Sequence, residues 1–142
     1  MPNTYSQLYI QFVFAVKYRK ALLNVSWDER LRLYITAIVQ NNGHKMLCIN
    51  NVADHIHLFI GMTPAQSASD LMRIIKADST KWINSQYLIP QKFSWQEGFG
   101  AFSYSHSHID RVVRYIHDQQ EHHRKAGFIQ EYRSQLDHFG IG

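Results

Sequence analysis

Two histidines, His55 and His57, stand two residues apart in a short apolar segment that runs from Asp54 to Ile60. Alternate side chains of a β-strand point to the same side, so the segment predicts two imidazole rings on one face of a sheet. Two neighbouring imidazoles can bind one divalent metal ion, because each neutral ring offers a nitrogen lone pair. Two surface histidines on the solvated face of an antiparallel strand fit the same pattern, and the segment alone leaves both interpretations open.

A tyrosine and a glutamine at helical spacing form a second polar group further along the chain. Tyr115 and Gln119 are four residues apart, so an α-helix places them on the same face. The helix is expected to begin after a cap at Ser107 and to end at Gly127. Its second half is almost wholly polar, whereas its first half carries an apolar stripe that can pack on its own domain. The stripe consists of Ile109, Val112, Val113 and Ile116.

The elements that must position these residues follow from hydrophobic periodicity and turn residues. Strands are expected at 5–17, 46–52, 54–60 and 93–104. One helix is expected between a cap at Ser26 and the sequence Asn41-Asn42-Gly43, and a second is expected to open at Gln66-Ser67-Ala68-Ser69. The order β-α-β-β-α-β predicts an α+β fold of the ferredoxin-like or RRM-like kind. We expect an antiparallel sheet with helices mainly on one face, followed by the Tyr115 helix and a short tail helix over 128–139.

Composition and length set the broad class. A chain of 142 residues with 45% hydrophobic residues fits one domain, expected over residues 1–142. The net charge of +4 allows an anionic partner such as nucleic acid. The single cysteine, Cys48, excludes an internal disulfide and a zinc site built from cysteines. We expect a cytoplasmic protein with no membrane partner, because the sequence shows no signal peptide and no apolar run of roughly 18–20 residues.

The two polar groups together resemble those of a known family. Asp-His-Ile-His-Leu-Phe-Ile at 54–60 resembles the His-hydrophobic-His strand of the one-tyrosine HUH transposases, which belong to the bacterial insertion-sequence 200/605 family. Tyr-Ile-His-Asp-Gln-Gln-Glu-His-His at 115–123 resembles that family's catalytic helix, and the segments at 70–77 and 95–103 are also similar. The resemblance spans nearly the whole chain, with the motifs in the family's order.

This resemblance implies a DNA strand transferase that acts on single-stranded DNA with hairpin ends. His55, His57 and the side-chain oxygen of Gln119 would hold one Mg²⁺ or Mn²⁺ ion, and imidazole ligands favour Mn²⁺. Tyr115 would be the nucleophile, and a nearby cation would help because a phenol attacks poorly at neutral pH. Asp54 would orient one of the histidines. The product would be a 5′-phosphotyrosine and a free 3′-OH.

The resemblance also implies a homodimer with active sites shared between the subunits. A site built by one chain would require the polar half of the Tyr115 helix to fold back over its own sheet. We therefore expect His55 and His57 from one chain to meet Tyr115 and Gln119 from its partner.

DNA contacts and alternative functions are less constrained by the sequence. Tyr104 and Tyr132 are rival nucleophiles, but His108 stands four positions after Tyr104 and Leu136 four positions after Tyr132, so neither repeats the Tyr-x-x-x-Gln spacing. A metal-dependent phosphoesterase that uses water, a nucleic-acid-binding module without covalent chemistry, and a domesticated relative that nicks repeated palindromes remain alternatives. The expected phosphate contacts are drawn from seven basic residues: Lys17, Arg19, Lys20, Arg73, Lys76, Arg111 and Arg114.

Overall fold

The computed structural model describes residues 5–119, so predictions that fall on residues 120–142 lie outside this part of the chain. These predictions are the rival nucleophile Tyr132 and the tail helix. The Tyr115 helix, which was expected to run to Gly127, ends at His117, so its predicted length is wrong. The described elements follow one another as β1-α1-β2-β3-α2-β4-α3, with two short 3-10 turns, η1 (Lys17–Arg19) and η2 (His106–His108). Within residues 5–119, no helix is long and apolar enough to cross a membrane.

The four strands form one antiparallel sheet in the order β2-β3-β1-β4. Their bounds are Leu8–Ala15 for β1, Lys45–Asn51 for β2, His55–Met62 for β3 and Gly100–Tyr104 for β4. The predicted α+β class is confirmed, and the segment with the two histidines is a central strand. The last strand is shorter than predicted, because Trp95 makes only an isolated bridge with Val16.

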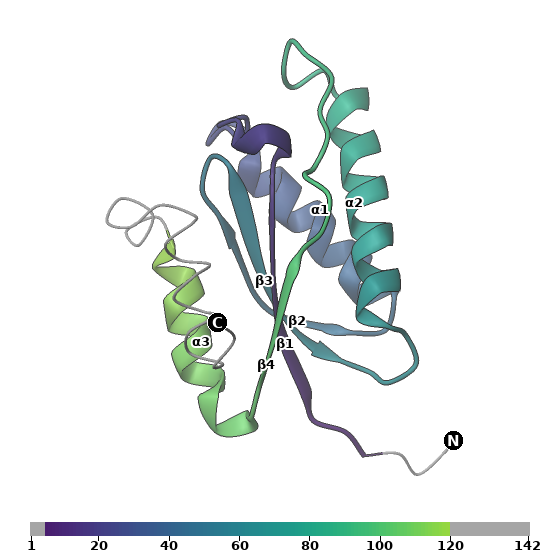
Figure 1. Cartoon of the computed structure of the whole chain (residues 1–142), viewed down its shortest axis with the longest axis vertical. Helices are drawn as coiled ribbons and strands as arrows, with labels where there is room; N and C mark the ends of the chain where they lie inside the picture. The colour runs from purple at the N-terminus through teal and green to yellow at the C-terminus, as the bar shows by residue number, and fades with distance from the viewer. Residues whose placement is uncertain (1–4, 120–142) are drawn as a thin grey trace.

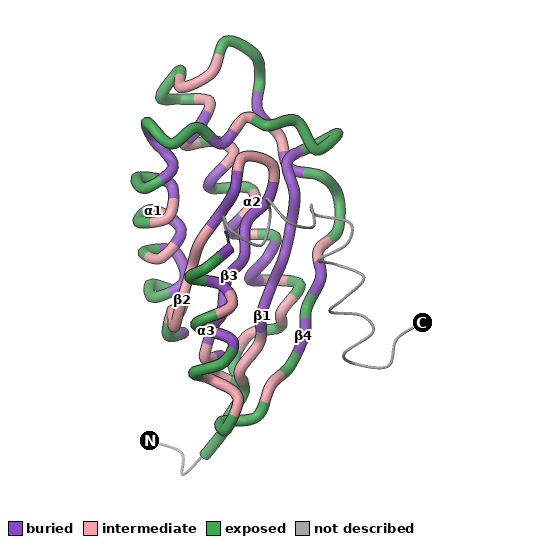
Figure 2. The backbone as a smooth tube through the Cα atoms, turned by 90° about the vertical axis from the view of Figure 1, so that its left-hand side faces the viewer, coloured by how far each residue is buried: buried purple, intermediate pink, exposed green. Residues whose placement is uncertain are grey.

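Helices cover both faces of the sheet, but unequally (Figure 1). α1 (Asp28–Asn41) and α2 (Ala68–Ser85) lie on one face, and α3 (Ile109–His117) lies on the other. The main core fills the space beneath α1 and α2, and the buried stretches of β1 and β3 run through the middle of the molecule (Figure 2). A much smaller cluster beneath α3 contains the buried residues Phe59, Val112 and Ile116.

The ends of the helices agree only partly with the sequence. Ser67 caps α2, since its hydroxyl accepts a hydrogen bond from the Asp70 amide at 3.0 Å. The predicted caps at Ser26 and Ser107 are wrong, because α1 follows Trp27, α3 follows His108, and neither helix has a side-chain cap. The predicted end of α1 is confirmed, with Gly43 at a φ of +88°.

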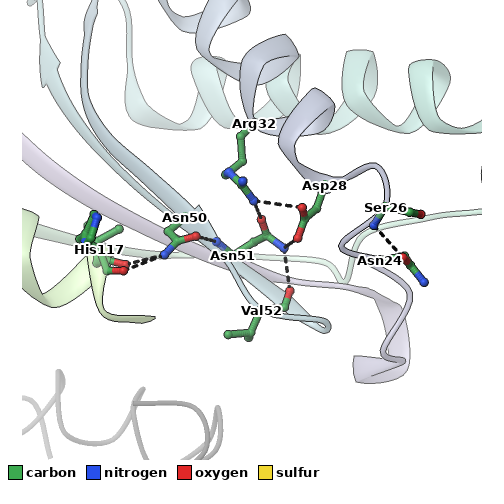
Figure 3. A network of polar contacts seen from close by, with 9 residues as sticks. Asn24, Ser26, Asp28, Arg32, Asn50, Asn51, Val52 and His117 are labelled. Carbon is green, nitrogen blue, oxygen red and sulfur yellow. Dashed lines mark hydrogen bonds and ion pairs between the residues drawn. The ribbon is translucent and has the colours of Figure 1, made fainter. Parts of the chain in front are cut away.

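Strand β2 joins the two layers through a bulge and a pair of asparagines. The bulge lies between Met46 and Cys48, so that Leu47 and Cys48 both pack in the cluster beneath α3. Asn50 then donates to two carbonyls at the end of α3, whereas Asn51 bonds Arg32 and Asp28 on α1 (Figure 3). Neighbouring amides therefore hold helices on opposite faces.

Candidate active site

The rings of His55 and His57 lie on the face of β3 that α3 covers, with centroids 5.2 Å apart. Their strand neighbours Ile56 and Leu58 are in the main core, which confirms the predicted alternation. Both histidines are buried, with 0% and 1% of their surface exposed. The interpretation of two solvated surface histidines is therefore wrong.

Each imidazole is oriented through its Nδ1 atom. His55 Nδ1 lies 2.8 Å from Asp54 Oδ1, and His57 Nδ1 lies 3.1 Å from Oε1 of Gln11 on β1. A carboxylate and an amide oxygen only accept hydrogen bonds, so each Nδ1 carries the hydrogen and donates it. Each Nε2 then has the lone pair, which is the state of histidine that binds metals. Asp54 thus has the geometry expected of a residue that orients His55.

Gln119 lies two residues beyond the end of α3 and is fully buried, with 0% of its surface exposed. Its Nε2 atom lies 3.2 Å from Nε2 of His55, to which the amide hydrogen is donated. If the side-chain amide of Gln119 rotated by half a turn, its Oε1 atom would face His55 Nε2 in place of the amide nitrogen. The argument that the polar residues after His117 would leave their own sheet is wrong for Gln119, because the chain returns this residue to its own His55.

Tyr115 lies on α3 with its ring centroid 6.0 Å from that of His57. Apolar packing on β3 and hydrogen bonds from β2 hold the helix in this position. Val112 and Ile116 pack on Phe59 of β3, and Asn50 Nδ2 donates to the carbonyl oxygens of Ile116 at 3.0 Å and His117 at 3.1 Å (Figure 3). One chain therefore brings together the tyrosine, both histidines and the glutamine that the sequence singled out.

The rival nucleophile Tyr104 lies in a different environment. Burial raises the pKa of its phenol above the usual value of 10.0. Its ring packs against Phe59, at 6.0 Å between centroids, and His108, at 6.3 Å. A raised pKa lowers the fraction of phenolate at neutral pH, so the surroundings of Tyr104 disfavour nucleophilic attack.

Comparison with known protein families gives one match over most of the chain. The model of the IS200-like transposase family matches residues 4–119 of the chain, which include His55, His57, Tyr115 and Gln119. The chain belongs to this family.

Relatives of this IS200-like transposase are distant in sequence. The chain is 23% identical over 120 residues to the ISDra2 transposase TnpA of Deinococcus radiodurans, which covers 81% of this chain and 86% of the relative. A crystal structure of a transposase from D. radiodurans superposes with a TM-score of 0.68 at 21% identity, over 84% of this chain and 95% of the other. The structure of a REP-associated tyrosine transposase bound to a REP hairpin superposes with a TM-score of 0.65 at 17% identity. This superposition covers 87% of this chain and 73% of the other.

The seven basic residues expected to contact DNA lie in three separate places on this transposase. Two are on α2, on the face opposite the histidines, and both have intramolecular partners. Arg73 pairs with Asp70 at 2.7 Å, and Lys76 Nζ donates to the carbonyl oxygens of Gln96 and Gly98. Burial also lowers the pKa of Lys76. Their contacts with DNA stay predictions.

The other five basic residues lie nearer the histidines in the fold. Arg111 and Arg114 are exposed on α3. Lys17, Arg19 and Lys20 follow β1, whose last residue, Ala15, is paired with His55. These two groups are better placed than α2 for a strand that reaches Tyr115.

The side chains at the site fit a divalent metal ion. Within residues 5–119, no group of three or more His, Cys, Asp or Glu side chains comes together, so a third ligand from this part of the chain would be of another type. The amide of Gln119 meets this need beside the two oriented imidazoles. Two nitrogen donors and one amide oxygen suit Mn²⁺ better than Mg²⁺, which prefers oxygen ligands.

Sequence reasoning missed two residues of the site, Gln11 and Asn50. Gln11 is 1% exposed and supplies the acceptor for His57. A signal was present, because Gln11 is the one amide within the otherwise apolar and aromatic segment Leu8–Ala15. Asn50 carries no comparable signal, since Asn50 and Asn51 are adjacent and only the fold separates their roles.

Proposed function

We propose that this IS200-like transposase cleaves and rejoins single-stranded DNA at hairpin ends, with Tyr115 as the nucleophile. The observation that carries the proposal is the placement of the Tyr115 ring, 6.0 Å from that of His57, beside two histidines oriented through Nδ1. The structural neighbour that was solved with a REP hairpin supports hairpin DNA as the substrate class.

In the proposed cleavage step, the phenolic oxygen of Tyr115 attacks the phosphorus of the scissile phosphodiester. A bond forms between the tyrosine oxygen and phosphorus, and the bond from phosphorus to the 3′ oxygen breaks. The phenol loses its proton and the 3′ oxygen gains one, which leaves a 5′-phosphotyrosine and a free 3′-OH. Because one phosphodiester replaces another, a second 3′-OH can reverse the step and join two strands without ATP.

His55, His57 and Gln119 would hold Mg²⁺ or Mn²⁺, and the bound ion would supply Lewis-acid polarisation of the phosphate. The protein's own contribution is positional. Asp54 and Gln11 keep both imidazoles in the Nδ1–H tautomer, while the packing of α3 on β2 and β3 fixes the direction from which the phenol approaches.

A homodimer with shared sites is also part of this proposal. If two copies exchanged α3, every contact described within one chain would form between the chains instead. The segment that would act as the hinge is short, since only Ser105 and η2 separate β4 from α3. Short connections favour such exchange.

The nucleophile is tested by covalent capture of a labelled single-stranded oligonucleotide from the DNA flanking the gene. On a denaturing gel, the unchanged protein should form a covalent adduct and Tyr115→Phe should form none, while gel shift shows equal binding by both proteins. Tyr104→Phe is the matched control and should retain the adduct. Cleavage without any adduct would support water as the nucleophile and refute the proposal.

Shared sites are tested by mixing Tyr115→Phe protein with His57→Ala protein under conditions that allow subunits to exchange. In a shared arrangement, each mixed dimer keeps one intact site, so cleavage should return. If exchange is confirmed by differently tagged subunits and the mixture stays inactive, each chain uses its own tyrosine, as in the geometry of the single chain.

A further inference from the structure

The turn that follows β1 exposes an aromatic ring between two lysines. Tyr18 has 75% of its surface exposed. The ammonium nitrogens of Lys17 and Lys20 lie 5.4 Å and 6.0 Å from the centroid of its ring. An exposed aromatic ring with two flexible lysines over it has the composition of a site where a nucleobase takes the place of a lysine on the ring and the lysines neutralise the adjoining phosphates.

The backbone holds this ring in place by an unusual conformation. Tyr18 and Arg19 are consecutive non-glycine residues in the left-handed region, with φ values of 58° and 52°. Such residues persist only where the surroundings impose the conformation, and they are concentrated at functional sites. Here the Tyr18 amide donates to Gln96 Oε1 at 3.1 Å, and the Lys17 amide donates to the Ser94 carbonyl at 3.1 Å.

A surface hollow adjoins the ring and has a basic lining. Its volume is about 80 Å³, and Lys17, Lys20 and Lys92 are among the residues that line it. The hollow has room for a group the size of a phosphate. A phosphate in the hollow would lie next to a base stacked on the Tyr18 ring.

The turn also lies at the right end of the sheet. The Val16 amide, just before η1, donates to the carbonyl oxygen of Asp54, whose carboxylate orients His55. A strand that lies over the turn would therefore reach the end of β3 at which His55 and His57 are located.

We propose that Tyr18 is a stacking platform for a base of the bound single-stranded DNA, with Lys17, Lys20 and Lys92 neutralising the adjacent phosphates. This rests on the proposed action on single-stranded DNA, but it assigns a site distinct from Tyr115 and the histidines. Stacking on an aromatic side chain does not depend on base identity, so the platform would grip the strand without selecting its sequence.

The test compares binding of two labelled strands of equal length, an oligodeoxythymidine and a strand of abasic sugar-phosphates. Both carry the same charge, so a preference for the first reports contacts with bases. The unchanged protein should prefer the oligodeoxythymidine by about tenfold, a ratio within the range for one stacked base. Tyr18→Gly should lose most of this preference, and Tyr18→Phe should keep it. A preference that survives Tyr18→Gly would overturn the platform.

Glycine is the informative replacement because it relieves the left-handed backbone while it removes the ring. Thermal stability of Tyr18→Gly should be equal or higher, so weaker binding would not reflect unfolding. Tyr87 provides the matched control, since it is 89% exposed at a φ of 52° and does not line the hollow. Tyr87→Gly should change the base preference by less than about twofold, and an equal loss in both variants would refute a specific role for Tyr18.

Covalent capture separates this inference from the proposed function. If Tyr18→Gly loses the base preference while the unchanged protein forms no adduct, the platform stands and the role of Tyr115 falls. If the adduct forms but Tyr18→Gly keeps the preference, the platform falls and the role of Tyr115 stands.

Discussion

The two faces of the sheet differ in how much of their burial serves stability. Beneath α1 and α2, side chains from both helices and from β1 and β3 form a large apolar cluster. Beneath α3, the apolar cluster has only three buried members among the described residues, Phe59, Val112 and Ile116, and buried polar side chains such as His55, His57 and Gln119 lie on the same face. Most of the apolar burial lies on the first face, so the second can bury histidines and amides whose desolvation would be costly in an apolar core.

His57 and Leu58 are adjacent on β3 but point to opposite faces of the sheet, so substitutions at these two residues should have different effects. His57→Ala should lower the cleavage rate by about a thousandfold, because metal polarisation is worth several kcal/mol. Leu58→Ala, on the other face, should lower the free energy of unfolding by about 2–5 kcal/mol. Urea unfolding and single-turnover cleavage measure the two effects. Equal loss of stability in both variants would contradict a division of labour between the faces.

Metal binding should stabilise the α3 face without any DNA present. At roughly 100-fold excess of Mn²⁺ over its dissociation constant, the free energy of unfolding should rise by about 2.7 kcal/mol. Thermal unfolding with and without Mn²⁺ measures this change, and His57→Ala is the control that should show none. An equal shift in the two proteins would place the ion elsewhere.

Gln11 should affect the metal more than the fold. Gln11→Leu keeps the approximate shape but removes the oxygen that accepts from His57 Nδ1, so Mn²⁺ affinity should fall by about 10–100-fold. Titration of the Mn²⁺-dependent shift in melting temperature measures the affinity. Gln11→Glu restores an acceptor and should recover most of it, whereas a purely structural role would leave affinity unchanged in both variants.

The smallest effect concerns the packing of α3. Ile116→Val should lower the free energy of unfolding by only about 0.5–1.5 kcal/mol, yet it should loosen the cover of Cys48, whose thiol donates to the Val113 carbonyl oxygen at 3.8 Å. Labelling of Cys48 with a thiol reagent should therefore be faster in the variant. Unchanged labelling would show that Ile116 does not hold α3 on the sheet.

The same thiol gives the direction of a pH effect. Burial raises the pKa of Cys48 above its usual value of 9.0. At a pH between 9.0 and the raised pKa, the Cys48 thiol keeps its proton in the folded protein but has lost it in the unfolded chain. The contribution of Cys48 to the free energy of unfolding therefore declines as the pH rises through the raised pKa. Labelling should accelerate at a higher pH in the folded protein than in the urea-unfolded protein.

The sequence allowed correct predictions where a single hydrophobic periodicity applies to a segment and where polar residues interrupt that periodicity. Alternation placed the rings of His55 and His57 on one face. Helical spacing predicted Tyr115 and Gln119 on one face of a helix, but α3 ends at His117, before Gln119. Sequence reasoning failed where the outcome depended on neighbours from distant segments. The direction taken by the chain after His117, which brings Gln119 to His55, depends on packing across the sheet, and no local pattern encodes it.

The neighbouring asparagines of β2 bear on how the protein avoids misfolding. β2 is an edge strand that pairs with β3 alone in the described sheet, so only one neighbouring strand sets its register. A shift of one residue would turn Asn50 toward α1 and Asn51 toward α3, and both helices would lose their amide partners at once. The two asparagines therefore help to fix the register of β2. A chain that paired β2 with β3 one residue out of register would lose hydrogen bonds on both faces of the sheet and could not keep a partly formed active site.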